Sequence, residues 1–272
     1  MIIFLFFTIW ILVFNLLTFL TGLTFWYIPL WLLSGFLSGY LFVVASFILL
    51  YPYAVLTKPT NRFKHYYVRS LSDFLRIFAL RVHIDQVIGK ENIPNDTNFV
   101  VYANHKSGTD AFVVESAIRQ PMAYAAKDSL FKIPIVRGWM KSIGALSIDR
   151  EKDRRALREI IRGINIIKGG LSMVVFPEGT RQDPETSLMS DTKAGSYKLA
   201  TKAEVPILPV AIIGTRNFQK YGIRRRTVTK VIIGKPLRFA DYQNLTTKEI
   251  SDNVHNTINN MIKQHDDLRK NS

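Results

Sequence analysis

The first 57 residues of this 272-residue chain contain no Asp, Glu, Lys, Arg or His, and the first charged residue is Lys58. The segment holds two apolar runs, from Ile2 to Leu20 and from Leu30 to Leu50. Each run is close to the ~20 residues with which a helix crosses the hydrocarbon layer of a bilayer. The linking stretch "TFWYIP" has the aromatic residues and the proline of an interfacial turn. We therefore predict a hydrophobic two-helix membrane anchor over residues 1–57.

A cleaved signal peptide is the alternative interpretation, but the segment lacks a basic start and a small-residue cleavage site, and it is too long. Two arrangements fit the anchor: helices that cross the bilayer, and a hairpin that enters and returns. Gly35 and Gly39 have the small-xxx-small spacing that allows two helices to approach closely. Basic residues dominate the chain directly after the anchor, where Asp73 is outnumbered by Lys58, Arg62, Lys64, Arg69, Arg76 and Arg81. The positive-inside rule therefore predicts a cell-membrane protein in which the domain after the anchor lies on the cytoplasmic side.

The formal net charge of +15 comes entirely from residues 58–272. Such a charge suits the anionic surface of a membrane phospholipid bilayer and acidic substrates. Nucleic acid is the other usual partner of a basic protein, but the chain has an anchor and no aromatic-basic motif of a nucleic-acid reader, so we expect none. The absence of cysteine excludes disulfides, thiolate zinc sites and cysteine nucleophiles.

From about Val82 onward, short apolar runs alternate with segments of helical periodicity. The runs typical of buried strands are "NFVVYA", "MAYAA", "LSMVVF", "PILPVAII" and "VTKVIIG". The helical segments are "TDAFVVESAIR" and "DRRALREIIRGINIIKGG", the second of which ends at Gly169 and Gly170. This alternation predicts an α/β fold, a layered sheet with flanking helices, as a single domain over residues 58–272.

The tail from Thr246 to Leu268 has the pattern of a packing helix. Thr246 and Glu249 have capping-box spacing. The apolar residues that follow are spaced four apart, at Ile250, Val254, Ile258 and Ile262.

The stretch "NHKSGTD", residues 104–110, follows the first predicted strand and holds His105 and Asp110. Five positions apart on one helix, the two side chains would point about 140° apart and could not touch. We predict instead that His105 ends the loop and Asp110 lies in the first turn of the next helix, with Gly108 allowing the chain to fold back. An aspartate on one ring nitrogen leaves the other free to act as a general base. The alternative is a histidine held by a loop hydrogen bond and an aspartate that caps a helix.

No other catalytic or metal motif accompanies this pair. The chain has no GxSxG, HExxH, GxxxxGK[ST] or GxGxxG sequence. His65, His83, His255 and His265 lack partners at metal-ligand spacing, so we expect no metal site.

A second stretch, "VVFPEGTRQ" at residues 174–182, runs from a predicted strand into a turn that carries Arg181. In α/β sheets ligands collect at the carboxyl ends of strands, and an arginine fork suits two phosphate oxygens. The alternative is a tight turn with a surface arginine.

In these two stretches the chain resembles the 1-acylglycerol-3-phosphate O-acyltransferase (lysophosphatidic acid acyltransferase) family of glycerolipid acyltransferases. Four blocks match in order between residues 104 and 210: "NHKSGTD", "AKDSLFKIPIVRGWMKSIGALSIDR", "VVFPEGTR" and "VPILPV". The resemblance implies an enzyme that moves a fatty acyl group from an acyl thioester to the free hydroxyl of lysophosphatidic acid, giving phosphatidic acid. It implies no cofactor, with acyl-CoA or acyl-carrier protein as co-substrate.

The resemblance also implies the roles of individual residues. His105 is expected to be the catalytic base and Asp110 its partner. The acceptor's glycerol phosphate is expected to be held by Lys127, Arg137, Glu178, Gly179, Thr180 and Arg181, with Lys193 adding positive charge. Backbone amides near Gly108 or Gly179 are the expected donors to the oxyanion. The alternatives are an acyltransferase for another lysolipid or for glycerol 3-phosphate, and a non-catalytic lipid-binding module.

Overall fold

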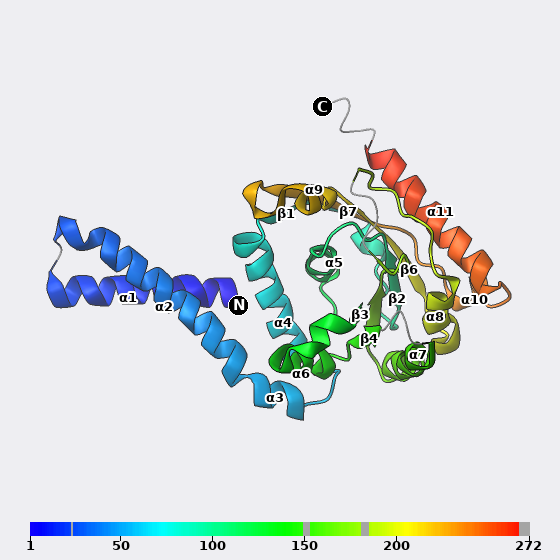
Figure 1. Cartoon of the computed structure of the whole chain (residues 1–272), viewed down its shortest axis with the longest axis horizontal. Helices are drawn as coiled ribbons and strands as arrows, with labels where there is room; N and C mark the ends of the chain where they lie inside the picture. The colour runs from blue at the N-terminus through cyan, green and yellow to red at the C-terminus, as the bar shows by residue number, and fades with distance from the viewer. Residues whose placement is uncertain (23, 149–152, 181–184, 267–272) are drawn as a thin grey trace.

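A computed structural model describes residues 1–22, 24–148, 153–180 and 185–266 of the chain. A pair of long helices extends from an α/β domain, in which helices lie on both sides of a central sheet (Figure 1). The fold class predicted from the sequence, an α/β domain preceded by two apolar helices, is therefore confirmed.

The N-terminal helices α1 (Ile2–Thr21) and α2 (Ile28–Leu49) form an antiparallel hairpin whose tip contains η1 (Phe25–Tyr27) (Figure 1). Both are long and apolar enough to cross a membrane. Gly35 and Gly39 of α2 are buried against α1, as their spacing predicted. A Cβ atom added at Gly35 would lie 2.7 Å from the carbonyl oxygen of Trp10, so only glycine permits this approach of the two backbones.

The anchor shares an apolar cluster with the domain. Ile2 and Phe6 of α1 are buried together with Phe74 of α4 (Arg62–Phe74) and Trp139 of α6 (Pro134–Ser142). The backbone N–H of Ile2 also donates a hydrogen bond of 2.7 Å to Oγ of Ser70. Removing the anchor would therefore expose apolar side chains of the domain.

Two of the basic residues that follow the anchor make internal contacts. Lys64 is buried, and its Nζ donates hydrogen bonds to the carbonyl oxygens of Ala54, at 2.9 Å, and Thr57, at 3.1 Å. Arg76 is also buried and donates a hydrogen bond of 2.7 Å to the carbonyl oxygen of Val82. Lys64 therefore links the end of the anchor to α4, and Arg76 links the first strand to η2 (Leu75–Ala79), which continues α4. Both charged side chains are buried inside the protein.

The sheet has seven strands in the order β1-β7-β6-β2-β5-β3-β4. Only β6 and β7 pair antiparallel among the described strands, and the other neighbouring pairs are parallel. The strands are β1 (Val82–Ile88), β2 (Val100–Ala103), β3 (Met122–Lys127), β4 (Leu146–Ile148), β5 (Ser172–Val175), β6 (Ile207–Ile213) and β7 (Thr227–Ile233). The prediction included five of them and missed β1, which is partly polar, and β4, which has three residues.

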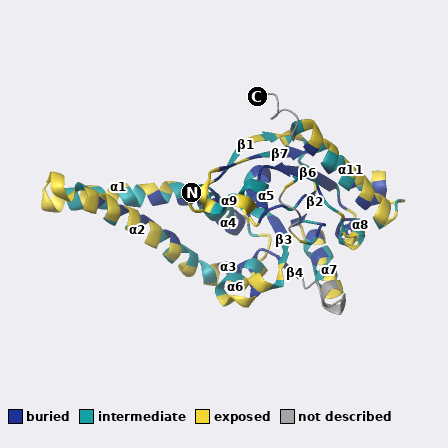
Figure 2. Cartoon of the chain, turned by 45° about the horizontal axis from the view of Figure 1, so that its top comes forward, coloured by how far each residue is buried: buried dark blue, intermediate teal, exposed yellow. Residues whose placement is uncertain are grey.

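Helices cover both faces of this sheet, and residues of β2 show the two layers. Val101 and Ala103 pack in the apolar cluster that includes α5 (Asp110–Ile118). Val100 and Tyr102 pack on the opposite face, against α7 (Asp153–Lys168), α8 (Lys198–Ala203) and α11 (Thr247–Asp266). Burial of all four β2 residues explains the continuous apolar run in the sequence, which is typical of a central parallel strand (Figure 2). The remaining helices are α3 (Tyr51–Leu56), α9 (Arg216–Tyr221) and α10 (Phe239–Tyr242).

The C-terminal helix α11 has the predicted cap and the predicted buried face. The backbone N–H of Thr246 donates to Glu249 Oε2 at 2.7 Å, and the N–H of Glu249 donates to Thr246 Oγ1 at 3.3 Å. The four apolar residues at four-residue spacing are all at most 1% exposed. The last residues of the predicted helix, 267–268, lie outside the described residues.

Candidate functional site

The sheet brings the two sequence motifs to one edge. Strand β2 is parallel to both β5 and β6, with Tyr102 paired to Val175 and to Pro209. The chain after β2, which carries His105, and the chain after β5, which carries Glu178, therefore leave the sheet side by side. This is the edge at which parallel α/β sheets bind ligands.

His105 and Asp110 are in contact, as the sequence predicted. Asp110 is the first residue of α5, and its Oδ2 lies 2.9 Å from Nδ1 of His105. The Asp110 side chain is fully buried, whereas 20% of the His105 side chain is exposed. The carboxylate is thus shielded from solvent, whereas the imidazole is partly accessible. Because the carboxylate accepts a hydrogen bond from Nδ1, Nε2 is left as the nitrogen without a hydrogen.

The same carboxylate oxygen also shapes the loop. It accepts hydrogen bonds from the backbone N–H groups of Lys106, at 2.7 Å, and Ser107, at 2.8 Å. An aspartate that accepts successive backbone N–H groups before a helix favours a tight turn at that point. The N-cap of α5 is Thr109, so Asp110 does not cap the helix, and its side chain instead holds the preceding loop and His105.

Phe176, the first residue after β5, stacks on the imidazole of His105. The ring centroids are 4.4 Å apart and the ring planes meet at 22°. This contact, with the Asp110 hydrogen bond, restricts the rotation of the imidazole. Phe176 was not predicted as a site residue, although its place directly before the Pro-Glu-Gly turn put it at the predicted ligand edge.

Glu178 contacts the histidine loop rather than open solvent. Its Oε1 accepts the backbone N–H of His105 at 2.6 Å and its Oε2 accepts the N–H of Ser190 at 3.2 Å. The side chain is buried, and Nζ of Lys106 lies 3.8 Å from Oε2. Burial raises the pKa of Glu178, while the N–H group of His105 and the charge of Lys106 act in the opposite direction. Both of its oxygens therefore accept backbone N–H groups, one from the histidine loop and one from Ser190.

Gly179 forms the turn itself. Its φ of +72° is in the left-handed region, and a Cβ atom there would lie 3.3 Å from Cε of Lys193. Its backbone N–H donates to the carbonyl oxygen of Phe176 at 3.0 Å. That amide is therefore used within the turn. Lys193 lies beside the turn, and its backbone N–H donates to the carbonyl oxygen of Pro177 at 2.9 Å.

The structure describes three of the other predicted substrate residues, Lys127, Arg137 and Thr180. Lys127 is the exposed last residue of β3, which runs parallel to β5, so it lies at the same edge as His105. Arg137 is exposed on α6, and Thr180 is the exposed last residue of the described turn. Arg181 lies outside the described residues.

Asn104, the residue before His105, fixes the loop to the neighbouring strand. Its Nδ2 donates to the carbonyl oxygens of Ile212, at 2.8 Å, and Ser187, at 3.0 Å, and its Oδ1 accepts the N–H of Ile212 at 2.7 Å. This role of Asn104 could not be predicted from the sequence, because its partners are backbone groups more than 80 residues away.

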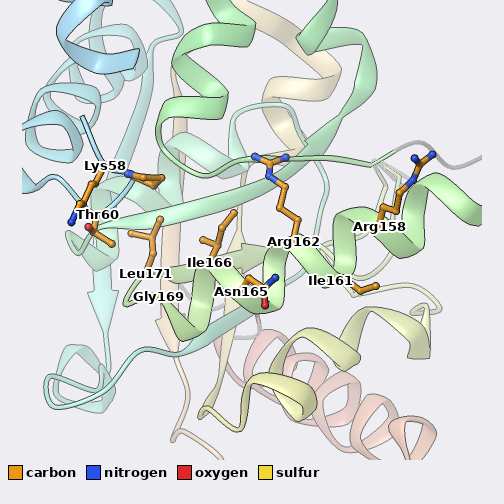
Figure 3. A pocket seen from close by; sticks show the side chains of 10 residues that line it. Lys58, Thr60, Arg158, Ile161, Arg162, Asn165, Ile166, Gly169 and Leu171 are labelled. Atoms are coloured by element: carbon orange, nitrogen blue, oxygen red, sulfur yellow. The ribbon is translucent and has the colours of Figure 1, made fainter. Parts of the chain in front are cut away.

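A cavity of about 500 Å³ lies elsewhere, between α7 and the chain that follows α3 (Figure 3). Lys58, Arg158 and Ile161 are among its lining residues, together with Leu171, which directly precedes β5. It is therefore at the amino end of β5, whereas His105 follows the carboxyl end of the parallel strand β2. The cavity is not part of the histidine site.

Comparison with known proteins agrees with this site. A family model described as "Acyltransferase" matches residues 85–213, which include both motifs. The 1-acyl-sn-glycerol-3-phosphate acyltransferase of Bacillus subtilis is 30% identical over 189 residues, covering 69% of this chain and 90% of that protein. The enzyme of the same name from Saccharomyces cerevisiae is 30% identical over 193 residues, covering 70% of this chain. The match spans 62% of that protein, less than two-thirds of its length.

A solved structure is similar in fold. It is the 1-acyl-sn-glycerophosphate (LPA) acyltransferase PlsC from Thermotoga maritima, which superposes with a TM-score of 0.61 at 26% sequence identity. The match covers 82% of this chain and 95% of that chain. On this fold, these motifs and these relatives, the chain belongs to the 1-acyl-sn-glycerol-3-phosphate acyltransferase family.

Proposed function

We propose that this chain is a membrane-bound enzyme that transfers a fatty acyl group from an acyl thioester to the free hydroxyl of lysophosphatidic acid, giving phosphatidic acid. The observation that carries this proposal is the buried carboxylate of Asp110 on Nδ1 of His105, at the ligand edge of the sheet. The names of the relatives support lysophosphatidic acid as the acceptor.

In the proposed reaction, Nε2 of His105 takes the proton of the acceptor hydroxyl as its oxygen attacks the thioester carbonyl. The new carbon–oxygen bond forms a tetrahedral intermediate, and the carbon–sulfur bond then breaks. The thiolate leaves and receives the proton from the imidazolium. Asp110 stabilises the imidazolium and keeps the hydrogen on Nδ1 throughout. The enzyme forms no covalent intermediate.

Positive side chains around this edge suit the phosphate of the acceptor. Lys127 and Lys193 are exposed there, and we propose that Arg181 adds a guanidinium fork. Glu178 would act indirectly, by holding the backbone of His105. Arg137 on α6 would contribute charge to the same approach path.

The hairpin of α1 and α2 supports attachment to a bilayer, because both helices are long and apolar and their outward residues are exposed. The basic residues after the anchor support a cytoplasmic position for the domain. There it would meet its lipid acceptor in the inner leaflet and a water-soluble acyl donor, either acyl-CoA or acyl-carrier protein.

The test is an acyl-transfer assay with the full chain reconstituted in liposomes. Lysophosphatidic acid, glycerol 3-phosphate and a lysolipid with a neutral headgroup would each be offered with acyl-CoA and with acyl-carrier protein. We expect phosphatidic acid from lysophosphatidic acid, and little product from the other acceptors. A preference for glycerol 3-phosphate would overturn the acceptor assignment, and no transfer from either donor to any acceptor would overturn the enzymatic function.

A further inference from the structure

Lys106 carries a buried ammonium group. Only 1% of its side chain is exposed, and its Nζ has no hydrogen-bond partner among the described residues. The carboxylate of Glu178 is 3.8 Å away and is also buried. Burial of an ammonium group is unfavourable unless an opposite charge compensates for it, so this arrangement calls for an explanation beyond packing.

Glu178 connects this lysine to the backbone of His105. Its Oε1 accepts the N–H of His105 at 2.6 Å, while its Oε2 faces Nζ of Lys106 and accepts the N–H of Ser190. The neighbouring N–H, that of Lys106 itself, is held by Asp110 at 2.7 Å. Two carboxylates thus accept successive backbone N–H groups of the histidine loop, and each of them needs to stay ionised to be a strong acceptor.

We propose that Lys106 is a positioning residue for His105. The buried charge of Lys106 keeps Glu178 ionised, and the ionised carboxylate in turn holds the backbone N–H of His105 in position. This inference rests on the proposed function of His105 as the base. Lys106 does not touch the reacting atoms in this proposal, and it acts through Glu178.

The charged groups around Glu178 belong to three segments. The loop before α5 contributes Lys106 and the imidazole of His105, whose Nδ1 is hydrogen-bonded to Asp110 of α5. The chain after the turn contributes Lys193, whose Nζ would be 3.7 Å from a Cβ atom at Gly179 and whose side chain is exposed. Lys106 is therefore the buried cation of this set, and solvent screens its charge least.

The test compares Lys106→Met, Lys106→Arg and the parent by kcat and KM across pH 5 to 9. Without Lys106, the pKa of Glu178 rises further, so Glu178 becomes protonated at a higher pH and releases His105. A charge at this distance shifts a pKa by about 1–3 units. In Lys106→Met the pH below which kcat falls, the acid limb of the profile, should therefore rise by about 1–3 pH units. KM should change little, and Lys106→Arg should keep the limb near its original place. The control is Lys202→Met on the exposed surface of α8, which should leave the profile unchanged.

A second comparison separates an effect through Glu178 from a direct effect of the Lys106 charge on His105. In a Glu178→Gln background position 178 no longer titrates, so adding Lys106→Met should produce no further movement of the acid limb beyond that set by His105. A limb that moves equally in both backgrounds would show direct action on His105 and would overturn the proposal. An unchanged limb in Lys106→Met would overturn it as well.

Loss of one partner of a buried ion pair can prevent folding, and the double variant Lys106→Met/Glu178→Gln avoids this because no charge is left unpaired. It should fold and transfer acyl groups at the reduced rate of Glu178→Gln, and a rate equal to that of the parent would overturn the proposal. Amide hydrogen exchange at His105 gives a readout that needs no activity, and exchange should be faster in Lys106→Met. If the parent itself transfers no acyl group, the proposed function fails. Equal exchange in the parent and the variant would refute the positioning role alone.

Discussion

Oδ2 of Asp110 lies 2.9 Å from Nδ1 of His105 and also accepts the backbone N–H groups of Lys106 and Ser107. One oxygen atom therefore holds both the imidazole and the backbone from which it projects. Because the side chain of Asp110 is fully buried, water does not compete for these hydrogen bonds. The orientation of His105 is thus built into the start of α5 and does not depend on a bound substrate.

The His105→Ala variant should lose transfer activity while keeping its fold, since His105 is part-exposed and its loss removes no core side chain. Asp110→Asn should lower kcat by about 10²–10⁴-fold, because the amide removes the charge that stabilises the imidazolium. The measurement is phosphatidic acid formation from lysophosphatidic acid at neutral pH. Thermal unfolding of both variants provides the control, and near-normal turnover in His105→Ala would exclude His105 as the base.

The sequence predicted the contact between these two residues because they are five positions apart at the junction of a predicted strand and a predicted helix, so the contact is local. The role of Glu178 could not be predicted in the same way. Its partners are the backbone N–H groups of His105 and Ser190, and a backbone group has no signature in the sequence. The family resemblance implied a contact of Glu178 with the acceptor, whereas the parallel pairing of β2 with β5 brings Glu178 to the histidine loop.

In the fold, too, features set by local sequence could be predicted, whereas features set by distant partners could not. The apolar runs of β2, β5 and β6 were recognisable because these central strands are buried on both faces. Edge strand β1 has exposed polar positions, and its sequence "VHIDQVI" resembles that of a loop or a short helix. Its identity depends on pairing with β7, which lies more than 140 residues later in the chain. The shared cluster of α1 and α4 was likewise invisible, because the apolar residues of α1 already had an explanation in the membrane.

Glu115 provides a prediction on stability. It is buried in α5, where it accepts a hydrogen bond from the hydroxyl of Tyr124, and burial raises the pKa of its carboxyl to about 7. As the pH rises from about 4.5 to 7, the unfolded chain releases a proton that the folded protein retains, so the folded state loses stability over this window. Above pH 7 the folded protein carries the full free-energy cost of ionising the buried carboxyl of Glu115.

The Glu115→Gln variant should therefore be more stable than the parent at pH 8, by roughly 3 kcal/mol, and about equally stable near pH 4.5. Denaturant unfolding at the two pH values in detergent measures this difference. Glu91→Gln, at an exposed position in η3 (Lys90–Asn92), is the matched control and should change neither value. If the parent and Glu115→Gln depend on pH in the same way, Glu115 does not carry this penalty.

The packing of the anchor gives a third prediction. In Gly35→Val the added side chain would meet the backbone of Trp10, whose carbonyl oxygen is 2.7 Å from the Cβ position. The helices must then separate, and overpacking of this kind costs about 1–3 kcal/mol. Thermal unfolding of the full chain in detergent should show the loss. Leu41→Val, on the exposed side of the same helix, should leave the unfolding temperature unchanged, and an equal loss in both variants would mean that the close approach is not what stabilises the hairpin.

Arg181 follows the described turn of Gly179 and Thr180, and it tests the acceptor phosphate. A hydrogen bond to a charged group contributes about 1.5–3 kcal/mol, so Arg181→Ala should lower kcat/KM for lysophosphatidic acid roughly ten- to a hundredfold. Arg181→Lys should recover only part of the loss, because an ammonium group supplies charge without the planar fork.

The decisive comparison uses an acceptor that lacks the phosphate, such as a monoacylglycerol. It should react poorly with the parent enzyme and lose little more in Arg181→Ala, because the group that the guanidinium binds is already absent. Measuring kcat/KM for both acceptors with both enzymes gives a double-difference cycle, which isolates the contact between Arg181 and the phosphate. Equal losses on the two acceptors would assign Arg181 to the stability of the turn or to the acyl donor, and the exposed Lys127 and Lys193 would then be the remaining cations at this edge to test for phosphate binding.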